Sequence, residues 1–363
     1  MSFTLSNIAP EIEHITIDDF DHIPKYRDID KIVEYSLPLS YHKDASRVIQ
    51  DIYEHNPEYR ETIFKKIFDH IFSLSVADIG NFFIQKIIEC DADKRVVIFN
   101  LLKNNLINFS FDQFGTHVIQ KLIKNIPEEY LVDISKEFNG HYVELALDEY
   151  GNQALQILIE KQGKKENEKI YQELKQYLIF LINNQFSYCI IKQLLLNCDD
   201  KTYNEIFYIA LQYLKVIIFD QFGNYLIQFF LEQKKGNYLD NLFQLIQTNI
   251  FYYSKDEFAI NVVETALKES NDLQRKFLIN EILRIDKNQK YFIISLAQDK
   301  CGNYLVQLIY EFGEEKTRKI IQKKIKSIDL TLSINNKENP ANFVMKKIKN
   351  LKQNEKGALN NYV

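Results

Sequence analysis

The segment Asp220–Gln228, DQFGNYLIQ, recurs along the chain and decides the fold. Copies of this segment end at Gln50, Gln85, Gln120, Gln156, Lys192, Glu264 and Gln307. Equivalent residues of successive copies lie 35 or 36 residues apart, except across a last interval of 43. Such a period indicates an array of repeats, because a unit of that size buries its apolar face only against its neighbours.

The composition favours helices and excludes several other classes of protein. Hydrophobic residues make up 46% of the 363 residues, charged residues 26%, and the mean hydropathy is -0.28. These values argue against both an integral membrane protein and a disordered chain. Ten Gly and six Pro are too few for the turns of a many-stranded β-protein. We find neither a targeting sequence nor an apolar run long enough to cross a membrane.

The four cysteines, Cys90, Cys189, Cys198 and Cys301, show neither the paired spacing of metal ligands nor the density of a disulfide scaffold. We interpret them as structural thiols of a protein from a reducing compartment.

Within each copy the residues have helical periodicity. In the central copy Leu226, Ile227, Phe230 and Leu231 fall on one apolar stripe. Ahead of the helix stands an expected N-cap, an Asp or Asn at positions 112, 148, 184, 220, 256 and 299. A small residue follows, which we expect to permit close approach of stacked helices: Gly115, Gly151, Ser187, Gly223, Ala259 or Gly302. Further apolar segments lie between the copies, so each repeat should hold two or three short helices.

Three positions of each copy are left for function, represented in the central copy by Asn224, Tyr225 and Gln228. The first and third of these are neighbours on one helix face, because they are four residues apart. An amide pair presents donors and acceptors that suit the edge of uracil, and the ring beside it can stack on the base. Glu264 instead suits the two N–H groups of guanine. The three positions therefore favour recognition of single-stranded RNA.

The array resembles the Pumilio (PUF) family of RNA-binding proteins from about Tyr41 to Lys349, through segments such as GNYLIQ, GNYLVQ and FAINVVE. The resemblance implies an all-α fold: a right-handed α-solenoid of eight repeats of about 36 residues, forming a crescent that binds RNA antiparallel on its inner face. We expect an N-terminal cap at 1–40, the eight repeats at 41–335, and a C-terminal cap with a degenerate repeat and a tail at 336–363.

The family's base code then applies repeat by repeat. Asn303 and Gln307 resemble a reader of U, Glu264 a reader of G, and Asn224 with Gln228 a second reader of U. Continuing toward the N-terminus, Asn152 with Gln156 suggests U, Thr116 with Gln120 a purine with A favoured, Asn81 with Gln85 U, and Ser46 with Gln50 A. Residues expected to stack on bases are Arg47, Phe82, His117, Tyr225, Asn261 and Tyr304. The predicted site is 5′-UGUNUAUA.

Three departures from the family pattern stand out. Ile260 replaces a small polar residue, so selectivity for G would rest on Glu264. Gln153 replaces the expected ring or Arg, which should weaken stacking. Tyr188 and Lys192 match no familiar code. In that repeat either Tyr188 stacks while Lys192 contacts a phosphate, or the repeat is structural only.

The net charge of -5 is not typical of a nucleic-acid-binding protein, but it is unevenly distributed. Residues 314–352 hold eleven Lys or Arg against four Asp or Glu, a local net charge of +7. The basic segment Lys316–Lys326 either attracts the RNA backbone or is a solvated helix face.

We therefore expect a sequence-specific RNA-binding adaptor that regulates mRNA through 3′ untranslated regions. Because catalytic and metal-binding motifs are lacking, we expect no enzyme, no cofactor and no metal. We further expect a cytoplasmic monomer whose protein effectors bind the convex face. One alternative is a protein-binding armadillo or HEAT scaffold, although the period is shorter than their 40 to 47 residues. The other is a nucleolar Pumilio-like factor of ribosome assembly.

Overall fold

The computed structural model describes residues 29–285, 291–331 and 340–360, and helices dominate all three segments. Among these residues the only β-type pairing is an isolated bridge between Ile285 and Tyr291, so the predicted all-α fold is confirmed. The chain divides into two bodies. The first runs to Tyr177 and includes Leu196–Cys198; the second comprises Leu178–Leu195 and the chain from Asp199 onward. Parts of both predicted caps, residues 1–28, 336–339 and 361–363, lie outside the described residues.

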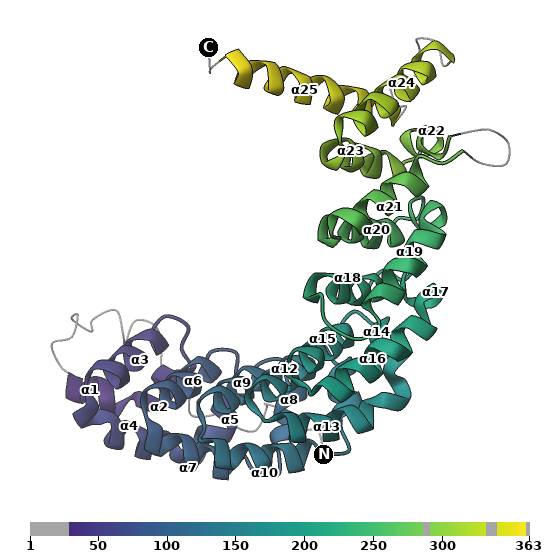
Figure 1. The fold of residues 1–363 in the computed structure, drawn as a ribbon. Helices are drawn as coiled ribbons and strands as arrows, with labels where there is room; N and C mark the ends of the chain where they lie inside the picture. The colour runs from purple at the N-terminus through teal and green to yellow at the C-terminus, as the bar shows by residue number, and fades with distance from the viewer. Residues whose placement is uncertain (1–28, 286–290, 332–339, 361–363) are drawn as a thin grey trace. The chain divides into compact units, whose positions relative to one another are not determined.

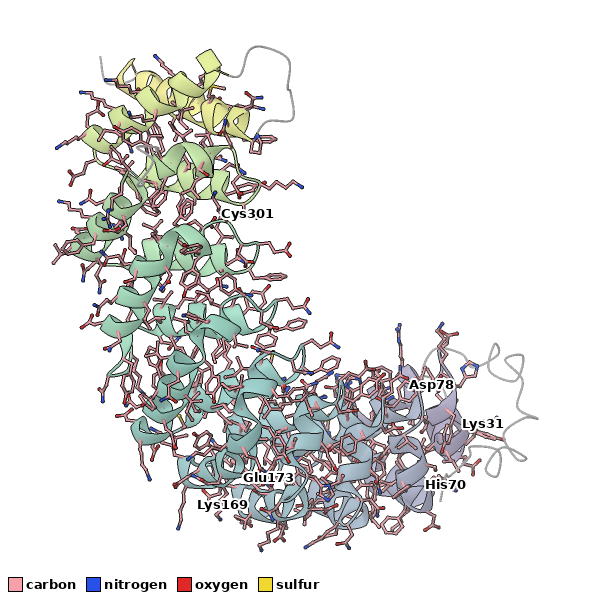
Figure 2. All side chains as sticks on the ribbon, turned by 90° about the vertical axis from the view of Figure 1, so that its right-hand side faces the viewer. Lys31, His70, Asp78, Lys169, Glu173 and Cys301 are labelled. Atoms are coloured by element: carbon pink, nitrogen blue, oxygen red, sulfur yellow. The ribbon has the colours of Figure 1, made fainter. Side chains whose placement is uncertain are left out.

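The first body is a row of short helices (Figure 1). In chain order these are α1 (Ile29–Glu34), α2 (Ser36–Tyr41), α3 (Ser46–His55), α4 (Arg60–Ile67), α5 (Ile71–Ser75), α6 (Gly80–Cys90), α7 (Ala92–Leu102), α8 (Leu106–Phe111), α9 (Gly115–Asn125), α10 (Glu128–Phe138), α11 (Tyr142–Leu147), α12 (Gly151–Lys161) and α13 (Lys164–Leu174), with 3-10 turns at Pro57–Tyr59, Phe68–His70 and Lys175–Tyr177. Figure 2 shows Asp78, in the loop before α6, on one side of this body, and Lys169 and Glu173 of α13 on the other.

The second body continues the same alternation of helices. Its helices are α14 (Leu178–Ile182), α15 (Ser187–Asn197), α16 (Asp200–Gln212), α17 (Leu214–Ile217), α18 (Gly223–Gln233), α19 (Leu239–Tyr253), α20 (Ala259–Glu269), α21 (Asp272–Ile282), α22 (Phe292–Ala297), α23 (Gly302–Phe312), α24 (Glu315–Thr331) and α25 (Ala341–Asn360).

The recurring motif begins one helix in every repeat. We call these eight helices the motif helices: α3, α6, α9, α12, α15, α18, α20 and α23. A short helix precedes each of them and a longer one follows, as in the series α8, α9 and α10. In α19 the longer helix and the next short one are fused into a single helix of 15 residues. The extra residues of the 43-residue interval lie where Ile285 and Tyr291 pair, on either side of 286–290.

The core is built from the apolar stripe of the motif helices, as predicted. Leu226, Ile227, Phe230 and Leu231 of α18 are all buried. The ring of Phe230 stacks on Phe207 of α16, with 4.0 Å between the ring centroids. Each such side chain contributes about 1.5–3 kcal/mol by leaving water. The stack of repeats therefore shares one continuous apolar interior within each body.

The predicted N-cap residues do cap, but the helix begins three residues further on. One carboxylate oxygen of Asp112 accepts the backbone N–H groups of Phe114 and Gly115, at 2.9 and 2.7 Å. The equivalent Asp or Asn side chain does the same at positions 148, 184, 220, 256 and 299. The prediction was thus right in chemistry and wrong in register, because a turn separates the capping residue from the first helical residue.

The small residue that starts each motif helix allows the predicted close approach of stacked helices, mainly between the motif helix and the helix just before it. A Cβ atom on Gly223 would meet the side-chain oxygen of Asn183 in the fifth repeat and would lie 2.7 Å from the carbonyl oxygen of Ile217, six residues earlier. In α15 the hydroxyl of Ser187 occupies this place and donates to the carbonyl of Leu181 at 2.8 Å. The chain turns sharply between the short helix and the motif helix, which brings the two backbones together.

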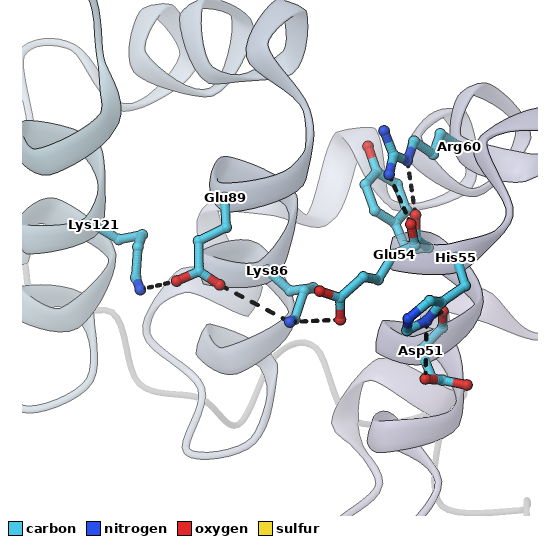
Figure 3. Close-up of polar contacts among 8 residues, drawn as sticks. Asp51, Glu54, His55, Arg60, Lys86, Glu89 and Lys121 are labelled. Atoms are coloured by element: carbon cyan, nitrogen blue, oxygen red, sulfur yellow. Dashed lines mark hydrogen bonds and ion pairs between the residues drawn. The ribbon is translucent and has the colours of Figure 1, made fainter.

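Polar side chains join neighbouring repeats of the first body (Figure 3). Lys86 of α6 donates to Glu54 of α3 at 2.8 Å, and Lys121 of α9 pairs with Glu89 of α6. Arg60 donates to the carbonyls of Tyr53 and Cys90, at the ends of α3 and α6. The ion pairs are exposed and individually weak, whereas Arg60 satisfies carbonyls that the helix ends leave unpaired.

The four cysteines are free thiols, of which Cys198 is buried. No single helix among the described residues has both the length and the apolar character to cross a membrane; one bent pair of segments, Pro57–Ser75 with Gly80–Cys90, passes by length and composition. In the same residues no three His, Cys, Asp or Glu side chains gather as a metal site would require.

Candidate functional site

Each motif helix presents its three predicted positions at different depths. In α18, Asn224 is 1% exposed, Tyr225 is 50% exposed and Gln228 lies between these extremes. Phe82 and Tyr304, the equivalents of Tyr225 in α6 and α23, are also exposed, at 54% and 63%. The ring is thus available for stacking, whereas the first position belongs to the helix surface that packs inward.

The buried Asn holds the Gln four residues later by a hydrogen bond. In α18 the Gln228 Nε2 donates to the Asn224 Oδ1 at 2.8 Å. The same bond joins the pair in α6, α12 and α23, at 2.8, 2.8 and 3.1 Å: Asn81 with Gln85, Asn152 with Gln156, and Asn303 with Gln307. The amide group of Asn224 is itself fixed, because its Nδ2 donates to the carbonyls of Asp220 and Gln221.

This arrangement differs from the expectation that both amides face a base. In α18 both Nδ2 hydrogens of Asn224 are directed to backbone carbonyls, and its Oδ1 accepts from Gln228. The Gln therefore offers the better placed polar group, with one remaining N–H and a carbonyl oxygen. Asn224 is the residue that orients it. Whether these side chains contact RNA stays a prediction.

In the third repeat the partner across the repeat boundary is Gln153. The Gln120 Nε2 donates to the Thr116 Oγ1 at 3.2 Å and to the Gln153 Oε1 at 3.1 Å. Thr116 in turn donates to the carbonyl of Tyr150 in the next repeat. From the sequence, Gln153 was expected only to weaken stacking, because it replaces a ring or Arg. In the structure it orients Gln120. His117, the expected stacking residue of this repeat, is exposed.

In the seventh repeat Glu264 lacks a polar partner at the first position, because Ile260 is apolar and 6% exposed. Its Oε2 lies 3.6 Å from the Nζ of Lys268, one turn further along α20. The next residue, Thr265, donates its hydroxyl to the Gln228 Oε1 at 3.0 Å. The sequence gives no signal for this role of Thr265, since its contact crosses from α20 to α18. Asn261, at the stacking position, is half-buried.

The fifth repeat has no amide or carboxylate at its edge positions. The ring of Tyr188 lies 6.3 Å from that of Phe222, with 18° between their planes, and 5.8 Å from that of Tyr225, at 31°. The Nζ of Lys192 lies 5.4 Å from the centroid of the Phe229 ring, a cation–π contact. A hydrogen bond with Cys189, aided by burial, raises the pKa of Tyr188 to about 12.

The first repeat and the basic segment complete the predicted site. Ser46 is buried, Arg47 is exposed and Gln50 is half-buried, so α3 repeats the pattern of depths. The segment Lys316–Lys326 lies on α24, where the Lys324 Nζ is 3.4 Å from the centroid of the Tyr291 ring. Lys319 pairs with Glu315 of its own helix.

Family comparison identifies the repeats. The Pumilio-family RNA binding repeat matches residues 37–68, 70–102, 105–137, 141–175, 217–246, 249–283 and 292–326, which together make up more than half of the chain. The chain therefore belongs to the Pumilio family. Seven segments match, and residues 176–216, which include α15, are not among them. The fifth repeat, which contains α15, is therefore assigned from its helices alone, and the family comparison supports seven repeats and not the expected eight.

Named relatives agree with this membership. The mRNA-binding protein PUF3 of Saccharomyces cerevisiae is 26% identical over 98 residues, which cover 25% of this chain and 11% of that protein. Among solved structures, a Puf3 RNA binding domain bound to the Cox17 RNA 3′ UTR recognition sequence site A has a TM-score of 0.82 at 23% identity, covering 92% of this chain and 99% of that one. PUF-8 in complex with PBE-RNA has a TM-score of 0.82 at 16% identity, covering 92% and 98%. These similarities show the fold, an α-solenoid of Pumilio type.

Proposed function

We propose that the protein binds single-stranded RNA in a sequence-specific manner and regulates mRNA through 3′ untranslated regions. One observation carries the proposal: four motif helices hold a Gln by the same hydrogen bond to a buried Asn, with a second position beside it that is an exposed ring in three of them. A polar group of fixed direction next to a stacking surface is what recognition of an unpaired base requires.

The proposed target is 5′-UGUNUAUA, with its 5′ end at the C-terminal repeats. In the second body, α23, α20 and α18 would recognise U, G and U in that order. The four motif helices of the first body would then recognise U, A, U and A, from α12 back to α3. In the first body Asp78, next to the α6 site, lies on the side opposite Lys169 and Glu173 of α13 (Figure 2).

Selection of RNA from a random pool by the purified chain tests the proposal. We expect enrichment of UGU, then one base of any kind, then a U/A-rich element. A pool that stays random after selection would overturn the proposal. Capture of extended peptides, without enrichment of RNA, would instead favour the protein-binding scaffold.

In this proposal the protein is an adaptor and not a catalyst. Repression or decay of the bound message would depend on protein effectors, which we propose bind away from the motif helices of a monomeric, cytoplasmic protein. The similarity of the repeats to RNA-binding relatives, among them the mRNA-binding protein PUF3, supports the choice of mRNA as the target. Cross-linking of the protein to RNA in cells, followed by sequencing, would distinguish messenger targets from the ribosomal RNA expected of a nucleolar factor.

A further inference from the structure

We propose that Tyr188 occupies the place of a base in the fifth repeat, so that the fourth nucleotide of the bound RNA is neither stacked nor recognised by its edge. The inference rests on the proposed function and assigns to it a residue that determines specificity.

Tyr188 covers one of the two faces that the Tyr225 ring could offer to a base. The Tyr188 ring comes from α15 and therefore covers the side of Tyr225 that faces the fifth repeat. The two ring centroids are 5.8 Å apart. A base inserted between two rings needs two van der Waals separations, about 7 Å in total. The space is too narrow, so no base stacks on this side of Tyr225 while Tyr188 stays in place.

Contacts with the sixth repeat hold Tyr188 against Tyr225. Its ring also lies nearly parallel to that of Phe222, the aromatic residue just before α18. Both distances fall within the range of favourable aromatic pairs. Tyr188 is thus supported by two rings of the sixth repeat, and at its own second position the fifth repeat has only Cys189, which offers no ring.

The edge positions of the fifth repeat, Tyr188 and Lys192, also lack the means to recognise the edge of a base. In α6, α9, α12, α18 and α23 the Gln at the third of the three positions is held by a polar partner at the first, as Gln228 is by Asn224. In the fifth repeat Lys192 instead directs its ammonium group to the ring of Phe229. Neither edge position therefore presents a fixed donor and acceptor pair to a base. The lack of a family match over residues 176–216 is consistent with a repeat that departs in this way.

The test uses the RNA UGUAUAUA and three versions of it, each with one abasic nucleotide, at position three, four or five. The unmodified protein is expected to lose no more than about 2-fold in affinity with the abasic nucleotide at position four. At position three the loss should reach at least about 5-fold, since a stacked base is removed. A loss at position four equal to that at position three would overturn the inference.

A second measurement uses a variant in which the fifth repeat has an amide pair at its edge positions. The double variant Tyr188→Asn with Lys192→Gln gives the fifth repeat the pair found in α18 and exposes the Tyr225 ring. It is expected to prefer U at position four and to lose at least about 5-fold with the abasic nucleotide there. Tyr188→Phe, which keeps the ring, is the matched control and should behave as the unmodified protein.

The outcomes separate the two proposals. If the intact RNA does not bind the unmodified protein, the proposed function fails and this inference fails with it. If the intact RNA binds but the fourth base contributes as much as its neighbours, only the inference fails. Because the abasic series needs no substitution in the protein, a double variant that does not fold leaves the test intact.

Discussion

The hydroxyl of Thr265 on α20 donates to the side-chain carbonyl of Gln228 on α18, with 3.0 Å between Oγ1 and Oε1. Gln228 also donates to Asn224, so its amide is held at both ends and by two repeats. Replacing Thr265 by Val removes the donor and keeps the shape. We expect the preference for U over C at the third base to fall by about 0.5–1.5 kcal/mol, the usual worth of such a bond.

Fluorescence anisotropy with UGU and UGC forms of the RNA measures this preference. Thr265→Ser keeps the hydroxyl and is the control, which should retain the preference. An unchanged ratio of affinities in Thr265→Val would show that the orientation of Gln228 is set by Asn224 alone.

Asn224 should matter for stability even without RNA. Replacing it by Ala removes the two hydrogen bonds that its Nδ2 donates to the part-buried carbonyls of Asp220 and Gln221. Each such bond contributes about 0.5–1.5 kcal/mol net, so the free energy of unfolding should fall by about 1–3 kcal/mol. Urea denaturation measures it. Gln228→Ala is the comparison and should cost less, because Gln228 is only half-buried.

Much of the fold could be predicted from the sequence because the period, the apolar stripe and the capping residue are local patterns. The stripe that contains Ile227 and Phe230 is buried as helical spacing requires. The capping by Asp112 was also predictable, since an Asp side chain accepts N–H groups two and three residues ahead.

The site was less predictable, because spacing gives the side of a helix but not the depth of a residue on that side. Asn224 and Gln228 share one face, yet the structure buries the first and leaves the second half-exposed. Contacts between repeats gave no sequence signal either. Thr265 and Gln153 orient side chains of a neighbouring repeat, and this depends on how one helix is rotated against the next.

Gly223 should not tolerate a side chain. A Cβ atom there would lie 2.7 Å from the carbonyl oxygen of Ile217, and the backbone cannot easily retreat. We expect Gly223→Ala to destabilise the protein by about 1–3 kcal/mol, as overpacking does. Thermal unfolding measures the loss. Ala259→Gly, the reverse change at the equivalent position of α20, should cost only about 0.5–1 kcal/mol. Equal stability of Gly223→Ala and the unmodified protein would contradict the close packing described above.

The pair of Glu54 and Lys86 should make stability depend on acid pH. The hydrogen bond from Lys86 lowers the pKa of Glu54 below its usual 4.5. The unfolded chain therefore binds this proton more readily than the folded one, so the contribution of the pair is present above about pH 4.5 and is lost as the pH falls through the lowered pKa. The stability difference between the unmodified protein and Glu54→Gln should shrink accordingly.

Denaturation at a series of pH values between neutral and acid checks this expectation. Asp51, His55 and Glu89 form ion pairs nearby, so the comparison must be made between variants and not from one profile. Glu129→Gln, at an exposed residue of α10 with no ion pair among the described residues, is the control and should show a difference that does not follow the same pH course.

Glu264 should carry the preference for G at the second base. It is the only polar side chain at the edge positions of α20, because Ile260 is buried and apolar. A carboxylate accepts two N–H groups, and a glutamine amide at the same place offers one acceptor and one donor. We expect Glu264→Gln to reduce discrimination between UGU and UUU by about 1–3 kcal/mol. Glu257→Gln, which makes the same change of charge in the exposed loop before α20, is the matched control and should keep the preference. Equal affinity of the unmodified protein for the two RNAs would contradict the role of Glu264. A smaller, equal loss in both variants would mean that charge near the RNA, and not the carboxylate of Glu264, sets the effect.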